Sequence, residues 1–458
     1  MTGFLLLSAC VDLKPGSDTQ QAQFPWNEKS ACEVDPADRE LVLVTEGIAQ
    51  DTRWDCSRHY LLNGLIYVRS GAVLTIDPGT FVLGLRADDA RNDDLSGFSG
   101  LIVERGARIV ADGTETDPIV FTSAGGRDGR TTGDWAGVVL MGNAPINAGT
   151  SVFFEGLPQE AANAFGGADP THDCGTLRYV RIEFAGARLA ADREINGLSL
   201  SGCGSGTEVD YVQVHFGRDD GLEIFGGTVD VRHIVISRAQ DDSLDWDMGW
   251  RGRAQFVVIQ QDDGDTNDGI EADNLEGVPD ALPRSEPLLY NVTLIGNNDA
   301  QADQTGVVLR RGTYGVIRNA IIAGFPHAAI DVRGSEAAAG ATLEEPRLAV
   351  ENSFFFDIGG PGGQAYFELE AGESDDDGGF AEDDFFSDEA RQNRFGASVD
   401  LLDPYNLLSP DFTLRETSDA QSSGSVPPDD GFFDTSAIFS GAMATEDWTA
   451  NWTAYPSR

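Results

Sequence analysis

Short apolar, β-branched runs recur along the chain, separated by Gly, Asp and Asn. Examples are Leu65–Val68, Tyr179–Ile182, Tyr211–Val214, His233–Ile236 and Phe256–Ile259. No long stretch has an apolar period near 3.6 residues, so the crossover helices of a βαβ fold are not predicted. Strands this short, recurring every ~20–30 residues, predict an all-β right-handed parallel β-helix, in which coils stack about 4.8 Å apart. A large β-sandwich is the alternative, and it favours tight Asn-Gly hairpin turns.

A second set of strands repeats in register. Asp220–Glu223, Asp242–Asp245 and Asp268–Glu271 start 22 and 26 residues apart, and Asn196–Ser199 comes 24 residues earlier. Because side chains alternate along a strand, alignment of these coils places Leu198, Leu222, Leu244 and Ile270 inside. The outward neighbours are Ser199, Glu223, Asp245 and Glu271. Two residues further along, the outward column reads Ser201, Phe225, Asp247, Asp273, Arg310 and Arg333.

The composition is strongly acidic. The 458 residues include 31 Lys+Arg against 76 Asp+Glu, a formal net charge of −45. Such a chain does not bind phosphate backbones or anionic membrane surfaces, so nucleic acid is excluded as a general partner. The 25 Phe and 7 Trp provide a sizeable core. Only Lys14 and Lys29 are lysines, which favours a halophilic protein in concentrated salt, where self-repulsion is screened. The alternative is an ordinary acidic secreted protein encoded by a GC-rich genome, which favours Arg over Lys.

The N-terminus indicates the cell envelope. Phe4–Cys10 is an apolar run far too short to span a membrane. Leu7–Cys10 resembles a bacterial lipobox, which implies a lipoprotein signal peptide over 1–10 with Cys10 as the lipidated residue. No basic residue precedes Phe4, unlike an ordinary signal peptide. The polar stretch 11–40 is expected to act as a tether. A chance apolar N-terminus is the alternative.

Four further cysteines remain, namely Cys32, Cys56, Cys174 and Cys203. An even number of cysteines in an exported protein, here four, allows two disulfides. Proximity in the sequence favours Cys32–Cys56 with Cys174–Cys203 over the other two pairings. No Cys-x-x-Cys pair exists, so zinc and redox sites have little support.

Several stretches carry a family resemblance. They are Gly71–Thr80, Gly133–Gly137, Gly142–Asn147, Glu194–Leu198, Asp219–Gly227, Tyr290–Gly296 and Asp447–Thr453. With these stretches the chain resembles the parallel β-helix lipoproteins of Bacteroidetes-type bacteria, from about residue 41 to the C-terminus. The resemblance implies the fold and an outer-membrane address, facing the periplasm or the cell surface, but no established reaction. The acidic stretch 371–388 departs from the family as an insertion.

These observations divide the chain into five parts. The signal remnant (1–10) and tether (11–40) precede a β-helix of ten to twelve coils over 41–355. An acidic loop insertion follows at 356–400, and 401–458 is expected to form a last turn and a C-terminal capping segment that protects the strand edges. We expect a monomer.

The outward acidic column is the main candidate for chemistry. Neighbouring acids on adjacent coils, about 5 Å apart, repel each other by roughly 3 kcal/mol at an effective dielectric near 20. A shared proton, an arginine or a bound cation must offset this repulsion. Dense oxygen donors suit Ca²⁺. The candidate ligands are Glu223, Asp245, Asp247, Asp263, Asp265, Asp268 and Glu271. The structural alternative is that Asp and Asn at coil corners bind backbone amides.

Two functions from different classes follow. One is a non-enzymatic cell-surface module, anchored through Cys10, whose flank binds polysaccharide or a cell-surface partner. The other is a Ca²⁺-assisted polysaccharide lyase or glycoside hydrolase, with Glu223, Asp245 and Arg310 as candidate catalytic residues. In a lyase, Arg251, Arg253, Arg310 or Arg311 is the candidate base or substrate clamp. The charge of −45 disfavours a polyanionic substrate without cations, which favours the binding module.

The histidines and tryptophans are more ordinary. His215 and His233 lie in or beside strand runs and are expected to pack rather than bind metal. Trp246, Trp250, Trp448 and Trp452 are expected in the core or the C-terminal segment, with sugar stacking as the alternative. No nucleophile elbow, P-loop or dinucleotide fingerprint occurs.

Overall fold

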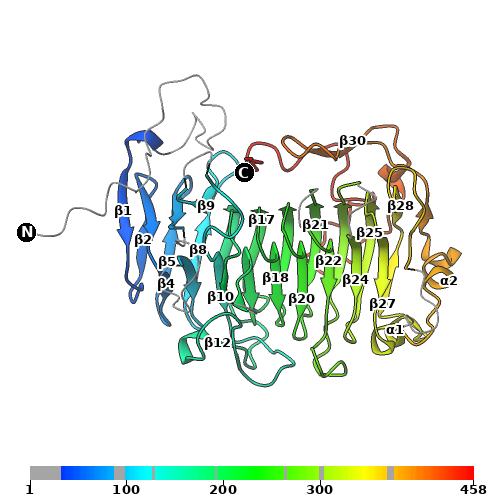
Figure 1. Ribbon diagram of the computed structural model, residues 1–458, viewed down its shortest axis with the longest axis horizontal. Helices are drawn as coiled ribbons and strands as arrows, with labels where there is room; N and C mark the ends of the chain where they lie inside the picture. The colour runs from blue at the N-terminus through cyan, green and yellow to red at the C-terminus, as the bar shows by residue number, and fades with distance from the viewer. Residues whose placement is uncertain are drawn as a thin grey trace, which may run out of the picture.

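Parallel strands stack along one axis in the computed structural model of the chain (Figure 1). The described residues are 32, 34–86, 98–125, 129–190, 193–262, 266–298, 304–368 and 376–457. Cys10, Asp263 and Asp265 therefore lie outside the described residues. The arrangement is the predicted right-handed parallel β-helix.

One parallel sheet has sixteen strands. Its main path runs through β1 (Glu40–Val44), β3 (Arg58–Leu62), β6 (Phe81–Gly84), β9 (Ile119–Ser123), β13 (Gly175–Glu183), β17 (Glu208–His215), β19 (Asp230–Ser237), β21 (Arg253–Gln260), β23 (Leu288–Ile295), β25 (Gly315–Ala323), β28 (Phe354–Phe356) and β29 (Arg394–Phe395). Four strands join it off this path: β2 (Thr52–Trp54), β5 (Val73–Ile76), β8 (Arg108–Asp112) and β27 (Leu348–Glu351).

The other parallel sheet has nine strands. In chain order they are β4 (Leu65–Val68), β7 (Gly100–Val103), β10 (Val138–Met141), β16 (Leu198–Ser201), β18 (Leu222–Phe225), β20 (Leu244–Asp247), β22 (Ile270–Ala272), β24 (Thr305–Leu309) and β26 (Ala328–Val332). Each of these strands pairs with the next in chain order. One coil of chain therefore contributes one strand to this sheet.

Shorter strand pairs and helices lie outside the two parallel sheets. The antiparallel pairs are β11 (Val152–Phe153) with β12 (Ala164–Phe165), β14 (Arg188–Ala190) with β15 (Arg193–Glu194), and β30 (Leu401–Asp403) with β31 (Asp411–Leu414). The helices are α1 (Ser335–Ala341), α2 (Glu382–Phe386) and the 3₁₀ turns η2 (Pro36–Asp38), η4 (Ala161–Asn163), η6 (Glu389–Arg391) and η7 (Asp419–Ser422). Among the described residues, no helix is long and apolar enough to cross a membrane.

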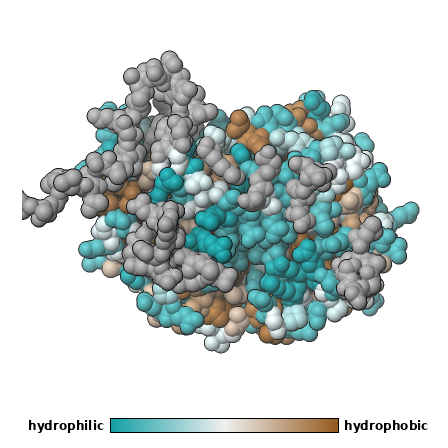
Figure 2. Space-filling view, viewed as in Figure 1, coloured by the Kyte–Doolittle hydropathy of each residue, from teal (hydrophilic) through white to brown (hydrophobic). Residues whose placement is uncertain are grey.

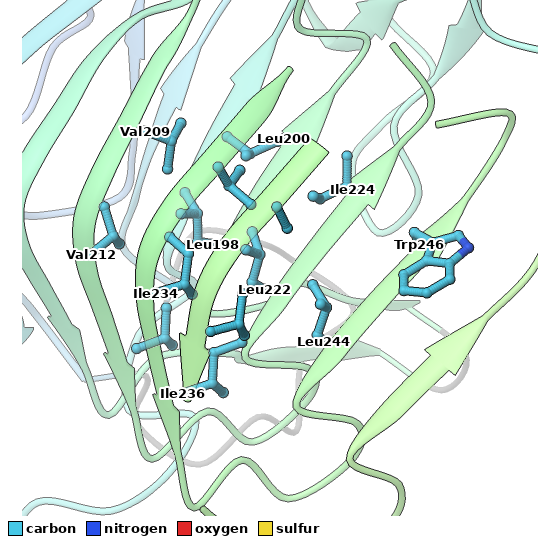
Figure 3. Packing of buried hydrophobic residues seen from close by; sticks show 14 of the residues in the cluster. Leu198, Leu200, Val209, Val212, Leu222, Ile224, Ile234, Ile236, Leu244 and Trp246 are labelled. Carbon is cyan, nitrogen blue, oxygen red and sulfur yellow. The ribbon is translucent and has the colours of Figure 1, made fainter. Parts of the chain in front are cut away.

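The predicted inward ladder occupies the interior of the coil. Leu198, Leu222, Leu244 and Ile270 are consecutive register partners on β16, β18, β20 and β22, and all are buried (Figure 3). Burial of such an aliphatic side chain stabilises the fold by about 1.5–3 kcal/mol. Trp246 also points inward, and its Nε1 donates to Thr313 Oγ1 over 3.1 Å.

The long strands of the sixteen-stranded sheet bend at one repeated position. Tyr179, Tyr211, His233 and Phe256 have φ between 48° and 61°, and Asn291 continues the column at 57°. Their rings stack, with centroids 4.4 Å apart for Tyr179–Tyr211 and 4.1 Å for Tyr211–His233. The stacking offsets the strain of the left-handed backbone. His233 is thus packed, as expected.

The C-terminal segment folds back onto the β-helix, along the outer face of the sixteen-stranded sheet (Figure 1). Trp452 is fully buried there, and its ring meets the stacked rings of Tyr179 and Tyr211 edge-on, at 5.9 Å from each. His215 is bonded through Nε2 to the carbonyl of Pro456 over 3.0 Å. Burial lowers the pKa of His215 to about 3, so this imidazole is neutral. The segment covers a flank of many coils as well as closing the last ones.

The acidic stretch near the end of the coil contains a short helix and a short strand. Within 356–400, α2 carries the buried Phe386, and β29 adds to the sheet beside β28. Glu382 accepts a hydrogen bond from the backbone N–H of Val332 on β26. This segment therefore closes the final coils with a short helix, where the sequence predicted only a loop.

Both disulfides are present, Cys32–Cys56 and Cys174–Cys203, which is the pairing that proximity favoured. Cys174 and Cys203 are fully buried within the core of the coil. This bridge ties the start of β13 to the turn after β16.

Candidate functional site

The outward acids lie in a cleft of about 340 Å³ over the nine-stranded sheet. Hydrophilic residues gather over the middle of the molecule in the space-filling view (Figure 2). The floor of the cleft is formed by β18, β20 and β22, and its lining includes twelve acidic residues: Glu155, Glu194, Asp219, Asp220, Glu223, Asp241, Asp242, Asp245, Asp247, Glu271, Asp273 and Glu276.

The register of the floor agrees with the predicted ladder. Glu223, Asp245 and Glu271 are direct partners on neighbouring strands. All three are buried, with 6 to 8 % of their surface exposed. Identical outward positions on stacked coils therefore bring three carboxylates into one column.

A second acidic column stands at the corner that precedes these strands. Asp220 Oδ1 accepts the backbone N–H of Asp242 over 3.0 Å, and Asp242 Oδ1 accepts that of Asp268 over 2.8 Å. Asp268 Oδ1 continues the pattern with Thr305 N over 3.0 Å. The structural role expected for corner aspartates thus occupies one oxygen of each side chain. Asp220 and Asp242 also line the cleft.

The two columns together form clusters of oxygen donors. One carboxylate oxygen from each of Asp220, Glu223 and Asp245 lies within 4.8 Å of the other two. Asp219, Asp220 and Asp241 form a second group by the same measure, and Asp242, Asp268 and Glu271 form a third. Asp219, Asp220, Asp241 and Asp242 were absent from the predicted ligand set. The sequence feature that could have identified them is the pair of adjacent aspartates that precedes β18 and recurs before β20.

Arginines neutralise the C-terminal end of the ladder. Arg310 binds Asp273 through Nε over 2.8 Å and also pairs with Glu271. Arg311 adds a second contact to Asp273 over 2.6 Å, and Arg333 binds Asp331 on the next coil over 2.6 Å. Although burial lowers the pKa of Arg310, its bond to Asp273 and the charge of Glu271 outweigh burial and raise that pKa. Arg310 is therefore a firmly protonated counter-ion, which disfavours it as a base.

The Asp220–Glu223–Asp245 cluster has a different environment. Its hydrogen-bond donors among the described residues are neutral: Asn196 Nδ2 donates to Glu223, and the backbone N–H of Asp242 donates to Asp220. Asp245 Oδ1 is buried and has no hydrogen-bond partner among the described residues. A buried carboxylate oxygen without a partner is costly unless the group is protonated or binds a cation.

Burial and mutual repulsion raise the pKa of the clustered acids. Burial is the largest cause for Asp220, Glu223, Asp242 and Asp245, with neighbouring carboxylates adding to it, and the pKa of each is well above its usual range. At the rim, burial raises the pKa of Asp219 to about 8 and that of Asp247 to about 7. Glu271 reaches a pKa of about 7 despite the lowering effect of Arg310.

These residues fit a hard divalent cation. The donors are all oxygen, as Ca²⁺ requires, and the unpartnered Asp245 Oδ1 supplies a ligand atom that no protein group uses. Of the predicted ligands, the structure brings Glu223 and Asp245 into one group and Asp268 and Glu271 into another. Asp247 lines the same cleft beside them.

Loops and short strands that leave the coils form the walls of the cleft around its floor. Glu155, in the loop between β11 and β12, forms part of one wall. This loop is anchored by Phe154, whose ring meets that of Phe225 on β18 edge-on at 5.5 Å. Glu194 on β15 and the Leu275–Glu276 turn complete the lining. The ladder therefore lies in a cleft and not on a flat, uncovered face.

A second cavity, of about 510 Å³, adjoins the acidic cleft. The two share Glu194, Asp219 and Asp241. The other lining residues of the second cavity are Thr131, Thr132, Gly186, Arg188, Arg218 and Gln240. Glu194, Asp219 and Asp241 thus lie between the acidic cleft and a cavity that is lined by Arg188 and Arg218.

Comparisons with known proteins match this architecture. A family model described as a pectate-lyase like beta helix domain matches residues 46–371. Pectate lyase Pel9A matches with 14% identity over 83% of this chain and 89% of its own, at a TM-score of 0.33. The catalytic unit of a thermostable α-1,3-glucanase from Streptomyces thermodiastaticus matches with 9% identity, over 70% of this chain and 58% of its own, at a TM-score of 0.25. No curated protein sequence gives a significant match.

Proposed function

This chain belongs to the pectate-lyase-like β-helix family, and from that premise we propose that it binds polysaccharide through a Ca²⁺ ion held in its acidic cleft. The observation that carries the proposal is the buried Asp245 Oδ1, which has no hydrogen-bond partner among the described residues, in a side chain that has one oxygen within 4.8 Å of oxygens of Asp220 and Glu223. Family membership supports polysaccharide as the ligand class.

Asp220, Glu223 and Asp245 are the residues that would hold the ion. Their oxygens lie within 4.8 Å of one another, and no arginine pairs with them among the described residues. When bound, Ca²⁺ supplies a positive centre that accepts sugar hydroxyl or carboxylate oxygens. The surrounding protein orients the ligand, because the walls at Glu155 and Glu194 confine it to the cleft.

Calorimetric titration of Ca²⁺ at low salt tests the cation site. We expect binding by the wild type and a loss of at least about tenfold in affinity for Glu223→Gln and for Asp245→Asn. Glu208→Gln is the matched control, because Glu208 is an exposed acid of β17 that lines neither cavity. Absence of Ca²⁺ binding by the wild type, or equal binding by all variants, would contradict the proposal.

Polysaccharide cleavage by the same cleft is the second candidate. It is favoured by the short separations between carboxylate oxygens in the cleft, since one oxygen of each of Asp220, Glu223 and Asp245 lies within 4.8 Å of the other two. Retaining glycosidases place their two carboxyl groups about 5–5.5 Å apart. Incubation with a polysaccharide panel, with and without Ca²⁺, separates the candidates. New reducing ends or unsaturated products that vanish in both Glu223→Gln and Asp245→Asn would establish an enzyme in place of a binding module.

We further propose that Cys10 anchors the chain to the outer membrane as a lipoprotein, and that it works as a monomer. The apolar run Phe4–Leu7 before Cys10 supports the anchor. Metabolic labelling with a radioactive fatty acid tests it. Label that persists in a Cys10→Ser variant would contradict the anchor.

A further inference from the structure

The end of the C-terminal segment is held against a buried histidine on the sixteen-stranded sheet (Figure 1). We call residues 453–457 the terminal strap. Gln213 on β17 exchanges two hydrogen bonds of 2.9 Å with Ala454 of the strap. His215 lies two residues further along the same strand, and its Nε2 is 3.0 Å from the carbonyl oxygen of Pro456. Side chains of one strand of the β-helix therefore hold the strap in place.

The two hydrogen bonds of His215 fit a neutral imidazole. The residue has none of its surface exposed. Because the carbonyl oxygen of Pro456 can only accept, Nε2 carries the hydrogen of this bond. Nδ1 lies 2.7 Å from Ser237 Oγ, and in the neutral ring it accepts the hydroxyl hydrogen of that serine. A proton on Nδ1 would displace that hydrogen, which has no other acceptor among the described residues.

Arginines surround His215 on the side of the β-helix. Arg130 lies over the ring of Phe184, 4.6 Å from its centroid, and Arg238 lies over the ring of Phe216 at 4.3 Å. Both rings contact the imidazole, with centroids 6.2 and 4.4 Å from its own. A positive charge on the imidazole would therefore be repelled by the two guanidinium groups that lie behind these rings.

A third arginine joins this group through a shared carboxylate. Glu183 on β13 is the register partner of His215. It pairs with Arg181 over 3.2 Å and with Arg130 over 3.8 Å. Arg181 is buried, and its Nη1 donates to the carbonyl of Trp452, directly before the terminal strap, over 3.2 Å. The single negative charge of Glu183 is therefore already shared by two arginines.

The remaining neighbours of His215 add no net negative charge. Asp262 pairs with Arg238 over 2.7 Å, so these two charges balance. From the terminal strap, the ring of Tyr455 meets the imidazole edge-on at 5.9 Å, and burial raises the pKa of this phenol, which stays neutral. Burial is the largest cause that lowers the pKa of His215 to about 3, and the charges of the three arginines act in the same direction.

We propose that the terminal strap is released by acid and that the charge of His215 is the trigger. In the released state water reaches the imidazole, whose ordinary pKa is about 6.5. The docked state has the lower pKa and binds fewer protons than the released state, so acid favours release. Docking is at full strength above about pH 6.5, and it weakens progressively as the pH falls toward 3. The acidic cleft lies on the other sheet, so this switch does not depend on the proposed cation.

Amide hydrogen exchange of the full chain, measured by mass spectrometry at pH 7.5 and 5.0, tests the switch. Protection factors, which correct for the intrinsic effect of pH on exchange, are compared for peptides that cover the terminal strap. We expect wild-type protection to fall about 10- to 30-fold between these pH values, as a pKa of about 3 when docked and about 6.5 when released requires. The acids of the cleft affect global stability in the opposite direction, so this local readout separates the two effects.

His215→Gln is the decisive variant. Its amide keeps a donor for Pro456 and an acceptor for Ser237 but takes up no proton. Protection of the strap in this variant should therefore change less than about threefold between the two pH values. His327→Gln is the matched control, because this half-buried histidine between β25 and β26 pairs with Glu368 over 3.4 Å. The control should lose protection of the strap as the wild type does.

Two exchange results would overturn the proposal: wild-type protection that does not change with pH, or an equal loss in the wild type and in His215→Gln. NMR of the histidine-labelled wild type provides a second measurement if the variant does not dock at pH 7.5. Uptake of a proton by His215 near pH 6.5 while the terminal strap stays protected would also overturn the proposal. Protonation that coincides with the loss of protection would support it.

Discussion

The two sheets of the β-helix differ in the partners available to their outward polar side chains. On the sixteen-stranded sheet, the C-terminal segment supplies partners for many of them. Gln213 exchanges two hydrogen bonds of 2.9 Å with Ala454, and Asn291 Nδ2 donates to the carbonyl of Phe439 over 2.7 Å. On the nine-stranded sheet, the column of Glu223 and Asp245 has neighbours of the same charge and no covering segment that neutralises it.

This difference distinguishes structural polar residues from functional ones in a repetitive fold. Gln213 and Asn291 on one sheet and Glu223 and Asp245 on the other are all buried. Buried polar groups normally find partners within the protein. Gln213 and Asn291 follow that rule, whereas Asp245 Oδ1 does not. A ligand is the missing partner in our interpretation.

The same contrast recurs within the acidic ladder. At β24, the chain places Arg310 where the previous coils have acids, and Glu271 and Asp273 are neutralised internally. Toward β18 the ladder has no arginine of this kind among the described residues. The cation site is therefore expected over β18 and β20. The acids of the β22 coil are already paired with Arg310 and are not expected to bind the ion.

The largest expected effect on stability comes from a substitution in the C-terminal segment, which covers the sixteen-stranded sheet. Trp452→Ala should lower the free energy of unfolding by about 3–5 kcal/mol, because Trp452 is fully buried against Tyr179 and Tyr211. Denaturant unfolding measures the loss, and Ca²⁺ affinity should remain unchanged because the acidic cleft lies on the other sheet. Phe153→Ala, at a ring with 45% of its surface exposed, is the control and should cost much less. A small effect of Trp452→Ala would mean that the segment contributes little to the fold.

The acidic face should make stability depend on pH and on cations. Burial raises the pKa of Asp219 to about 8 and of Asp247 to about 7, so the folded chain keeps protons that the unfolded chain has lost above about pH 4. Without divalent cations, the free energy of unfolding should therefore fall as pH rises from about 4.5 to about 8, by roughly 3 kcal/mol or more. Saturating Ca²⁺ should largely remove this decline, because it neutralises the ionised acids.

Denaturation at several pH values, in chelator and in Ca²⁺, measures this behaviour. Asp245→Asn removes one of the repelling charges and should flatten the decline in chelator. Stability that rises with pH in chelator would show that the acids are not clustered as described.

A smaller effect is expected at the arginine end of the ladder. Arg310→Gln should destabilise the cation-free protein by about 1.5–3 kcal/mol, because Glu271 and Asp273 lose a charged donor. Ca²⁺ should restore more stability to this variant than to the wild type if a cation can substitute for the arginine. Thermal unfolding with and without Ca²⁺ measures both. Arg53→Gln, at a largely exposed ion pair with Asp77, is the control and should change stability by about 1 kcal/mol at most.

Much of the fold was predictable because a β-helix is built from local repeats. The strand runs at Tyr211–Val214 and His233–Ile236 are continuous in the sequence, and their alignment alone places Val212 beside Ile234. The same alignment placed Glu223, Asp245 and Glu271 in one column. The roles of the corner residues were harder to predict. Asp220 and Asp242 look the same in the sequence whether they bind a backbone N–H or a cation. In this structure, one oxygen of each accepts a backbone N–H.

The walls and the second cavity were not predictable in this way. Glu155 lies far from Asp219 in the sequence and outside the repeating strands, so no periodicity relates the two. Nothing in the sequence around Arg218 indicates that its guanidinium stays unpaired while Arg310 is bound twice. That distinction depends on which acids the folded loops bring near each arginine.

The sequence by itself determined the coil, its register, the interior ladder and the charge of the outward column, because these properties depend on spacing and on the alternation of side chains along a strand. Only the tertiary structure decided that the C-terminal segment covers one sheet and leaves the other as a cleft. It alone also decided which acids are neutralised, since burial and pairing depend on the distances between chemical groups from distant coils and loops.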